Sequence, residues 1–158
     1  MPSVVNTVII AGSAAAVFDL ATTARFWPQW HPASHAVGGV TQRPYQLGDL
    51  IHERGEVAGI PFQVTWKVEA HARPSRAVLR AETPPARIIY TFEGRGGATE
   101  FRRELEYDET VFRAAASDPD ALGRLMHTQS EEALRRLKEL VERTLREEAA
   151  APPPHRAG

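Results

Sequence analysis

Residues 62–71 read FQVTWKVEAH, and their pattern decides the fold class of this chain. Apolar residues occupy four alternate positions from Phe62 to Val68, so the segment predicts a strand with one apolar and one solvent-exposed face. The same period of two continues from Val37 to Tyr107. It is broken by turn signals at Gly38–Gly39, Arg43–Pro44, Gly59–Pro61, Arg73–Ser75, Pro84–Pro85 and Gly94–Gly97. The pattern therefore predicts about six antiparallel strands in this region.

The segment before this region predicts one more strand and two short helices. Val4 to Ile10 is rich in β-branched residues and is typical of a strand. Ser13 can cap a short amphipathic helix that follows it. A second short helix is predicted from Thr23 to Trp27, and Pro28 is expected to end it because proline disfavours helical geometry in the preceding residue.

The last element is predicted to be a long amphipathic helix that begins with Asp118 as N-cap and Pro119 as first helical residue. Its apolar side has 3.6-residue spacing and consists of Leu122, Leu125, Met126, Gln129, Ala133, Leu137, Leu140 and Thr144. Residues 149–158 are rich in proline and alanine and predict a disordered tail. Residues 1–148 are expected to form a single domain, the ordinary size for a chain of 158 residues.

Composition excludes several classes of function. The 19 Lys and Arg residues nearly balance the 20 Asp and Glu residues, so we expect no nucleic acid partner. Because cysteine is absent, the chain has no disulfide, zinc thiolate or cysteine nucleophile. The N-terminal residues do not resemble a signal peptide and no apolar run is long enough for stable membrane insertion, which predicts a cytoplasmic protein. The sequence does not predict the oligomeric state.

Six histidines invite a search for metal ligands. His31 and His35 are four residues apart, but Pro32 between them argues against a shared helical face, and no third ligand is recognisable nearby. The glycine-rich segment 94–97 joins two predicted strands and does not open a helix, unlike a phosphate-binding loop. We therefore expect neither a metal nor a cofactor.

The order of these elements favours an α+β helix-grip arrangement. In it, a curved antiparallel sheet of about seven strands wraps around the long C-terminal helix, and the two short helices follow strand one. Over residues 4–145 the chain resembles the SRPBCC superfamily, which includes START-like lipid-transfer domains and the polyketide cyclase/dehydrase family. The segments that carry the resemblance are Ile10–Ser13, Val17–Leu20, Trp27–Pro32, Gly48–Asp49 and Gly96–Glu100.

The resemblance implies an elongated apolar cavity between sheet and helix that holds a hydrophobic small molecule. Such sites combine apolar walls with a few polar groups that orient the ligand. The candidate ligand-binding walls are Trp30, Phe62, Trp66, Phe92, Phe101, Tyr107 and Met126. The alternative for each is ordinary packing in the core, the usual place of aromatic side chains.

Arg103 is the most informative polar residue because strand parity places it on an apolar face with Phe101 and Tyr107. A buried guanidinium stays charged and needs an anion or a developing negative charge beside it. We therefore name Arg103 and Tyr90 as candidates to stabilise an enolate or alkoxide oxygen. The alternatives are a salt bridge at the sheet edge or a register that turns Arg103 outward.

Glu53 and His31 are the candidate proton carriers. Glu53 shares parity with Ile51 and Val57, but Gly55 is a possible bulge that switches the faces, which would leave the carboxylate in solvent. His31 follows Trp30 at the predicted entrance and titrates near neutral pH. Its alternative role is to pack within a Trp-x-x-Trp-His-Pro corner.

Two functions from different classes fit these residues. The first is an enzyme similar to polyketide cyclases/dehydrases, with aldol cyclisation and dehydration of a hydrophobic substrate. The second is a carrier or sensor of a lipid-like or aromatic ligand, without chemistry. A third, a protein-interaction domain, needs an exposed apolar or strongly charged face, and the mixed charge of the C-terminal helix gives no sign of one.

Overall fold

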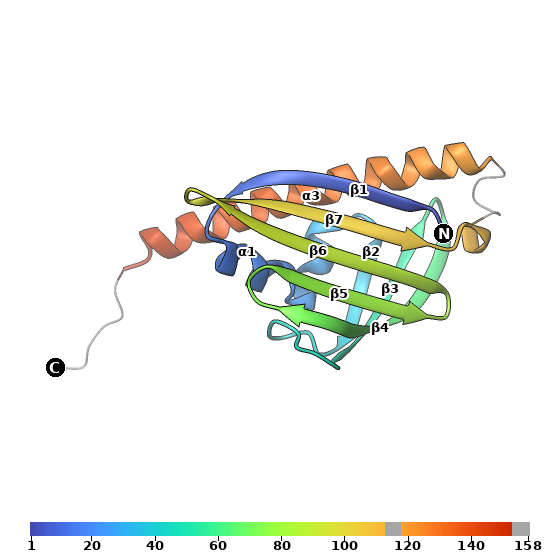
Figure 1. The fold of residues 1–158 in the computed structure, drawn as a ribbon, viewed down its shortest axis with the longest axis horizontal. Helices are drawn as coiled ribbons and strands as arrows, with labels where there is room; N and C mark the ends of the chain where they lie inside the picture. Colours follow the sequence, from blue (N-terminus) through green and yellow to red (C-terminus); the bar gives the residue numbers. More distant parts are fainter. Residues whose placement is uncertain (113–117, 153–158) are drawn as a thin grey trace.

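The computed structural model describes residues 1–112 and 118–152, and within them one curled antiparallel sheet faces a long helix (Figure 1). The seven strands of these residues lie in the order β1-β7-β6-β5-β4-β3-β2. Their bounds are β1 (Ser3–Ala11), β2 (Ser34–Gly39), β3 (Leu50–Val57), β4 (Ile60–Ala72), β5 (Arg76–Glu82), β6 (Pro85–Arg95) and β7 (Ala98–Tyr107). The predicted helix-grip fold is confirmed.

The helices of the described residues are α1 (Ala14–Ala21), η1 (Ala24–Phe26), α2 (Trp27–Trp30), η2 (Glu109–Phe112) and α3 (Pro119–Ala150). Ser13 Oγ accepts a hydrogen bond from Ala16 N at 3.2 Å, and Asp118 Oδ1 accepts one from Asp120 N at 3.0 Å. Both predicted caps are therefore confirmed. None of these helices combines the length and the hydropathy that a membrane span requires.

Two predicted helix boundaries are wrong. Pro28 does not end a helix: it lies in the first turn of α2, where its missing N–H has no intrahelical partner to lose. The second boundary concerns the tail, because α3 continues through Ala150 and so includes the first two residues of the predicted disordered segment. Residues 153–158 of that segment lie outside the described residues.

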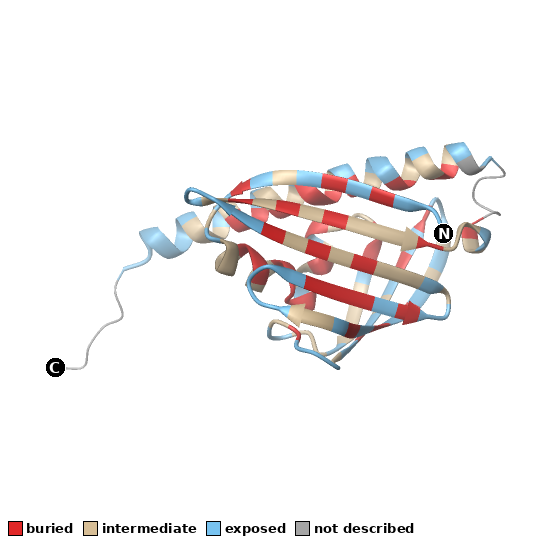
Figure 2. Cartoon of the chain, viewed as in Figure 1, coloured by how far each residue is buried: buried red, intermediate tan, exposed pale blue. Residues whose placement is uncertain are grey.

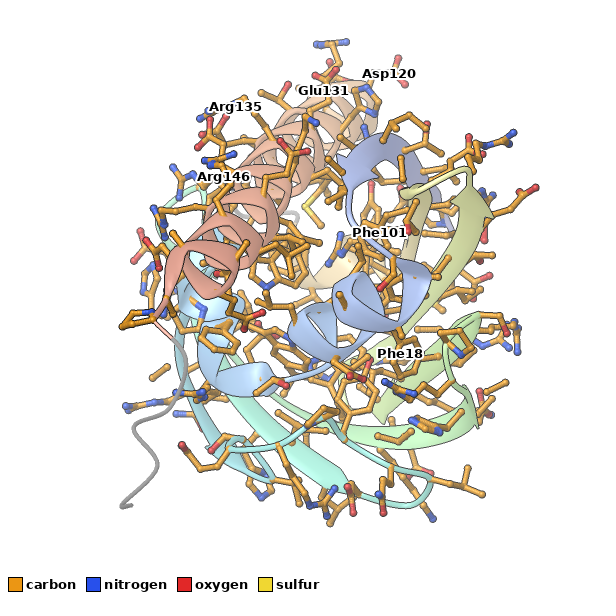
Figure 3. All side chains as sticks on the ribbon, turned by 90° about the vertical axis from the view of Figure 1, so that its left-hand side faces the viewer. Phe18, Phe101, Asp120, Glu131, Arg135 and Arg146 are labelled. Atoms are coloured by element: carbon orange, nitrogen blue, oxygen red, sulfur yellow. The ribbon has the colours of Figure 1, made fainter. Side chains whose placement is uncertain are left out.

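Alternation along the strands sorts side chains between the interior and solvent (Figure 2). In β4, Val64, Trp66 and Val68 are buried while the residues between them are exposed, as the sequence predicts. In α3 the predicted residues Leu125, Gln129 and Thr144 are half-buried and the other five are buried, and the buried side also includes Ser130, Leu134 and Val141. Figure 3 shows the sheet curving around this interior, with α3 across one side and α1 at the near end.

One end of the interior is filled by aromatic rings. Phe92 of β6 pairs with Phe101 of β7 across the strands, and their ring centroids are 5.0 Å apart. Phe18 of α1 covers them, with its centroid 4.9 Å from that of Phe92. Leu134 and Val141 of α3 belong to the same buried cluster. We call the region formed by these five residues the packed end.

The edge strand β1 is bonded to α3 through two side chains. Lys138 Nζ donates to Ile9 O at 2.9 Å, and Glu142 Oε2 accepts from Ala11 N at 2.9 Å. Lys138 and Glu142 also pair with each other along the helix. These bonds use main-chain groups that β1 does not direct toward β7, and they hold α3 along the sheet edge.

Candidate ligand-binding pocket

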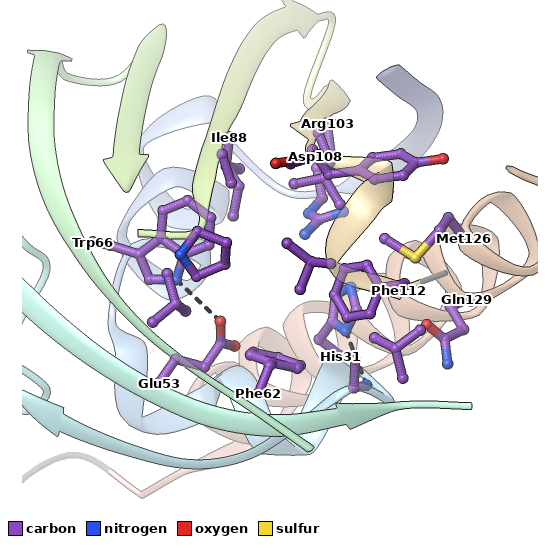
Figure 4. A pocket seen from close by; sticks show the side chains of 18 of the residues that line it. His31, Glu53, Phe62, Trp66, Ile88, Arg103, Asp108, Phe112, Met126 and Gln129 are labelled. Carbon is purple, nitrogen blue, oxygen red and sulfur yellow. Dashed lines mark hydrogen bonds between the residues drawn. The ribbon is translucent and has the colours of Figure 1, made fainter. Parts of the chain in front are cut away.

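A pocket of about 100 Å³ lies at the other end of the interior, bordered by strands β3, β4, β6 and β7, α2, η2 and the first part of α3 (Figure 4). We call this region the pocket end. Its apolar lining consists of Trp27, Trp30, Ala33, Val57, Phe62, Val64, Trp66, Pro84, Pro85, Ala86, Ile88, Leu105, Tyr107, Val111, Phe112 and Met126. Its polar lining consists of His31, Glu53, Tyr90, Arg103, Asp108 and Gln129.

Arg103 points into the pocket from β7 and is only 4% exposed. Its Nη1 donates a long hydrogen bond of 3.5 Å to Ser130 Oγ of α3, and its Nε has no hydrogen-bond partner among the described residues. Within those residues no carboxylate lies within 4.0 Å of the guanidinium. The pocket therefore contains a buried positive charge without a close anion, which is costly unless something else stabilises it.

Glu53 enters the pocket from the opposite wall, on β3 (Figure 4). Its Oε1 accepts a hydrogen bond of 3.0 Å from Trp66 Nε1, because Ile51 on the same face of β3 pairs with Trp66 in β4. Burial raises the pKa of Glu53, and the hydrogen bond from Trp66 and the charge of Arg103 oppose the rise. Glu53 as a whole residue is half-buried, and its carboxyl group lies against the indole of Trp66.

Strand β3 keeps its alternation throughout, so Gly55 does not switch its faces. Gly55 and Val57 are both buried on the side of Glu53, and the pairing of β3 with β4 is unbroken. The irregularity lies in β2, where the register shifts between Ser34 and Ala36 opposite Gly55. The alternative in which Glu53 projects into solvent is therefore wrong.

His31 lies at the end of α2 with one ring nitrogen already engaged. Its Nδ1 accepts a hydrogen bond of 3.1 Å from Ala33 N, so a neutral ring carries its proton on Nε2. Burial lowers the pKa of His31 well below 6.5, and the charges of Arg103 and Arg136 lower it further. His31 is thus a neutral hydrogen-bond donor at neutral pH. Its ring also packs near Trp30, with centroids 6.1 Å apart.

Two buried tyrosines are influenced by the charge of the guanidinium. Tyr90 pairs directly with Arg103 across β6 and β7. Burial raises the pKa of Tyr90 to about 12, although the neighbouring charge of Arg103 lowers it. Tyr45 is fully buried, its hydroxyl has no hydrogen-bond partner among the described residues, and burial raises its pKa well above 10. Both phenols are therefore protonated at neutral pH.

The structure brings together most of the predicted wall residues, but not all of them. Trp30, Phe62, Trp66, Tyr107 and Met126 line the pocket. The prediction for two other rings, Phe92 and Phe101, is wrong, because both belong to the packed end, where α1 covers the same sheet face. Strand parity identified the correct face but could not tell where along the strands the cavity stops.

Several lining residues were not named as site candidates. Val64, Ile88 and Leu105 share strand parity with residues that were named, so alternation alone could have found them. Gln129 is a polar residue on the apolar side of α3, which is the same signal that singled out Arg103. Asp108 and the two η2 residues follow the last strand, and no pattern in the sequence marks them.

The arrangement opposes a fixed cation and a carboxyl group across an apolar space. Arg103 and Tyr90 can donate hydrogen bonds to an oxygen that gains negative charge. Glu53 can accept a proton, and its raised pKa makes its carboxylate a stronger base than an ordinary glutamate. The described residues contain no group of three or more histidine and carboxylate side chains placed to hold a metal ion.

Comparison with known proteins agrees with this architecture. The profile of the family described as polyketide cyclase/dehydrase and lipid transport matches residues 1–142. No curated protein matches the chain by sequence. A START superfamily protein from Mycobacterium smegmatis is structurally similar, with a TM-score of 0.71 and 16% identity over 90% of this chain and 98% of that chain.

Two other solved structures extend the comparison. The protein TTHA0849 from Thermus thermophilus has a TM-score of 0.74 and 16% identity over 90% of this chain and 99% of that chain. The di-domain ARO/CYC BexL from the BE-7585A biosynthetic pathway has a TM-score of 0.63 and 22% identity over 90% of this chain and 47% of that chain. These structures share the fold. With the profile match over nearly its whole length, the chain belongs to the polyketide cyclase/dehydrase and lipid transport family of SRPBCC-type proteins.

Proposed function

We propose that this protein binds a compact hydrophobic carbonyl compound in the pocket and cyclises it by aldol addition and dehydration. The observation that supports this most directly is the pairing of a buried guanidinium that lacks a close carboxylate with a carboxyl group on the facing wall. Arg103 and Glu53 supply the two opposite functions that enolate chemistry needs, a stabilised oxyanion and a base. The family and the ARO/CYC structural neighbour support the same class of reaction.

In the first step, the Glu53 carboxylate takes a proton from the carbon beside a substrate carbonyl. The electron pair of that C–H bond moves onto the carbonyl oxygen, which becomes an enolate oxygen beside Arg103 and Tyr90. Neither donor has to move far from its position in the pocket, so little reorganisation opposes the charge shift. Trp66 and Phe62 flank Glu53 and would keep the reacting carbons flat against the apolar wall.

In the second step, the enolate carbon attacks another carbonyl of the same molecule and forms the ring bond. The alkoxide that results takes the proton back from Glu53. Loss of the hydroxyl group and a neighbouring proton as water then gives the dehydrated ring and regenerates both residues. Because Nδ1 of His31 is occupied, we assign proton transfer to Glu53 and give His31 the role of donating a hydrogen bond through Nε2.

A non-catalytic carrier or sensor is the second candidate. The lining is mostly apolar, and the family description includes lipid transport. A carrier would use the same walls, with Arg103 binding a polar group of the cargo. The two functions differ in what leaves the protein: a carrier releases its ligand unchanged, whereas the enzyme releases a product that has lost water.

The test begins with native mass spectrometry of protein purified from its own host, followed by denaturing extraction of any bound molecule. The extracted compound, or a short linear polyketone if none is retained, is then incubated with the protein and analysed for loss of water. We expect turnover that Arg103→Met abolishes while the fold persists, because exchanging a buried charge for an apolar side chain of similar length is often neutral for stability.

Arg102→Met is the matched control, since Arg102 is the next residue of β7 and its side chain lies on the outer face beside Glu104. This variant is expected to turn over substrate like the parent protein. Recovery of only unchanged ligand from the parent protein would favour the carrier. Equal turnover by the two methionine variants would remove Arg103 from the mechanism.

A further inference from the structure

Four polar side chains from three elements lie together where β1 and β7 face α3. Asn6 of β1 and Arg103 of β7 are directly paired residues of the sheet. His127 and Ser130 lie about one turn apart on α3. Asn6, Arg103 and Ser130 are each no more than 9% exposed. We call these four residues the polar cluster, and a buried group of this kind in an otherwise apolar interior calls for a reason.

The contacts within the polar cluster are long and leave two atoms without partners. Arg103 Nη1 donates to Ser130 Oγ at 3.5 Å, and Asn6 Nδ2 contacts His127 Nδ1 at 3.5 Å. The second contact engages the amide nitrogen of Asn6, so its amide oxygen is the group that remains for Arg103. Asn6 Oδ1 and Arg103 Nε are both buried and have no hydrogen-bond partner among the described residues.

These two atoms complement each other. An amide oxygen only accepts hydrogen bonds and the Nε–H of an arginine only donates them. The side chains of directly opposite residues in antiparallel strands begin about 4.5–5.5 Å apart at their Cβ atoms. Buried water molecules commonly bridge polar groups over such a span, because water both donates and accepts. Asn6 can therefore act on the guanidinium without direct contact.

The polar cluster surrounds a charged side chain that no ion pair holds. Among the described residues, Arg103 forms no salt bridge. An arginine side chain has several rotatable bonds, so it keeps one orientation only where its neighbours select it. On the α3 and β1 sides of Arg103, the neutral groups of Ser130 and Asn6 are placed to make that selection.

We propose that Asn6 and Ser130 are positioning residues that fix the Arg103 guanidinium toward the pocket, Ser130 directly and Asn6 through one bridging water molecule. The inference deepens the proposed function and rests on it for the part that Arg103 plays in the reaction. Asn6 and Ser130 lie outside the pocket lining, so neither touches the substrate. They hold the guanidinium in place before charge develops on the substrate oxygen, which makes its stabilisation of that charge effective.

The test measures the order parameter of the Arg103 Nε–H bond by NMR relaxation of isotope-labelled protein without any ligand. The signal is assigned by its loss in Arg103→Met. We expect an order parameter above about 0.8 in the parent protein and below about 0.6 in Ser130→Ala and in Asn6→Val. Each of the two substitutions removes a group that selects one orientation of the guanidinium. If Asn6→Val does not fold, Asn6→Ala removes the same acceptor.

Three further variants serve as controls. Thr128→Ala on α3 and Thr7→Val on β1 change exposed side chains of the same two elements, so both should keep the parent order parameter. Asn6→Asp is the conservative rescue, because a carboxylate at this position still accepts hydrogen bonds and also attracts the guanidinium by charge. Its order parameter should remain at the parent value.

A parent order parameter below about 0.6 would overturn the inference, because the guanidinium would then not be held. A parent-like value in either Ser130→Ala or Asn6→Val would overturn it as well. That outcome, combined with a lower unfolding free energy in urea, would mean that the polar cluster serves stability alone.

The turnover assay of the proposed function adds a second readout. Ser130→Ala and Asn6→Val should lower kcat by at least about tenfold and leave KM unchanged, because a misplaced guanidinium affects the transition state and the lining is intact. A change in KM alone would contradict the assignment. Absence of turnover in the parent protein would overturn the proposed function, and the NMR comparison would still decide whether the polar cluster fixes Arg103.

Discussion

The packed end and the pocket end are built on the same two strands but have opposite characters. On the inner face of β6 and β7, the pair Phe92 and Phe101 belongs to the packed end, and the next pair, Tyr90 and Arg103, belongs to the pocket end. Phe18 of α1 fills the space above the first pair. Two successive inner-face pairs of β6 and β7 therefore have different roles. One belongs to a core that stabilises the fold, and the next belongs to a lining that is available for function.

The first way to test this contrast is to remove one large ring at each end. Phe101→Ala is expected to lower the free energy of unfolding by about 3–5 kcal/mol, because Phe101 is fully buried against other rings. Phe62→Ala is expected to cost less by at least about 1 kcal/mol, since Phe62 borders existing empty space. Urea denaturation followed by circular dichroism measures both.

The control is the slope of the unfolding free energy against urea concentration. An unchanged slope shows that both variants still unfold in one step from a compact state. Equal losses of unfolding free energy at the two positions would contradict the contrast. They would mean that the pocket end is packed as tightly as the packed end in solution.

The second test concerns the carboxyl group at the pocket end. The folded protein holds the proton of Glu53 more tightly than the unfolded chain, so wild-type stability falls as pH rises from about 4.5 through the folded-state pKa. Glu53→Gln removes this loss and keeps an oxygen for Trp66. The difference in unfolding free energy between this variant and the wild type should therefore increase over that pH range, by about 1.4 kcal/mol for each pH unit between the two pKa values.

Glu56→Gln is the matched control on the same strand, because Glu56 is exposed on the outer face. Its unfolding free energy should follow the wild type at every pH. Urea denaturation of the three proteins between pH 4 and pH 8 gives the comparison. If the advantage of Glu53→Gln over the wild type does not grow with pH, the carboxyl group is as well solvated in the folded protein as in the unfolded chain.

The smallest expected effect comes from a surface ion pair beside the packed end. Arg73 contacts Asp19 of α1 through two hydrogen bonds of 2.8 Å, but both side chains are at least 40% exposed. A double-mutant cycle with Arg73→Ala and Asp19→Ala should give a coupling energy of about 0.2–1 kcal/mol that decreases with added salt. A larger coupling would show that α1 is held over the aromatic rings by charge as well as by packing.

Local patterns in the sequence predicted the fold well because each relevant pattern is strong. Alternation from Phe62 to Val68 fixed the face of β4, and the serine and aspartate caps fixed the starts of α1 and α3. Pro28 was misplaced because proline is compatible both with the end of one helix and with the first turn of the next. Only tertiary packing decides between these positions.

The site was predicted less completely because a cavity is a property of several elements at once. Strand alternation predicted that the Arg103 side chain points inward, and the burial of Arg103 agrees with that prediction. For Glu53 the sequence did not decide between the inner and the outer face of the sheet, because Gly55 suggested a bulge in the same strand. The register shift lies instead in the neighbouring strand β2. The assignment of Phe92 and Phe101 to the wall failed because the position of α1 over the sheet determines where the empty space ends.

The side chains of Lys138 and Glu142 have a consequence for how the protein meets other copies of itself. An exposed edge strand offers free main-chain donors and acceptors, and a second sheet can add to it. Along β1, the carbonyl of Ile9 and the amide of Ala11 are already occupied by α3. The C-terminal part of this sheet margin is thereby closed to strand addition by the same helix that closes the interior.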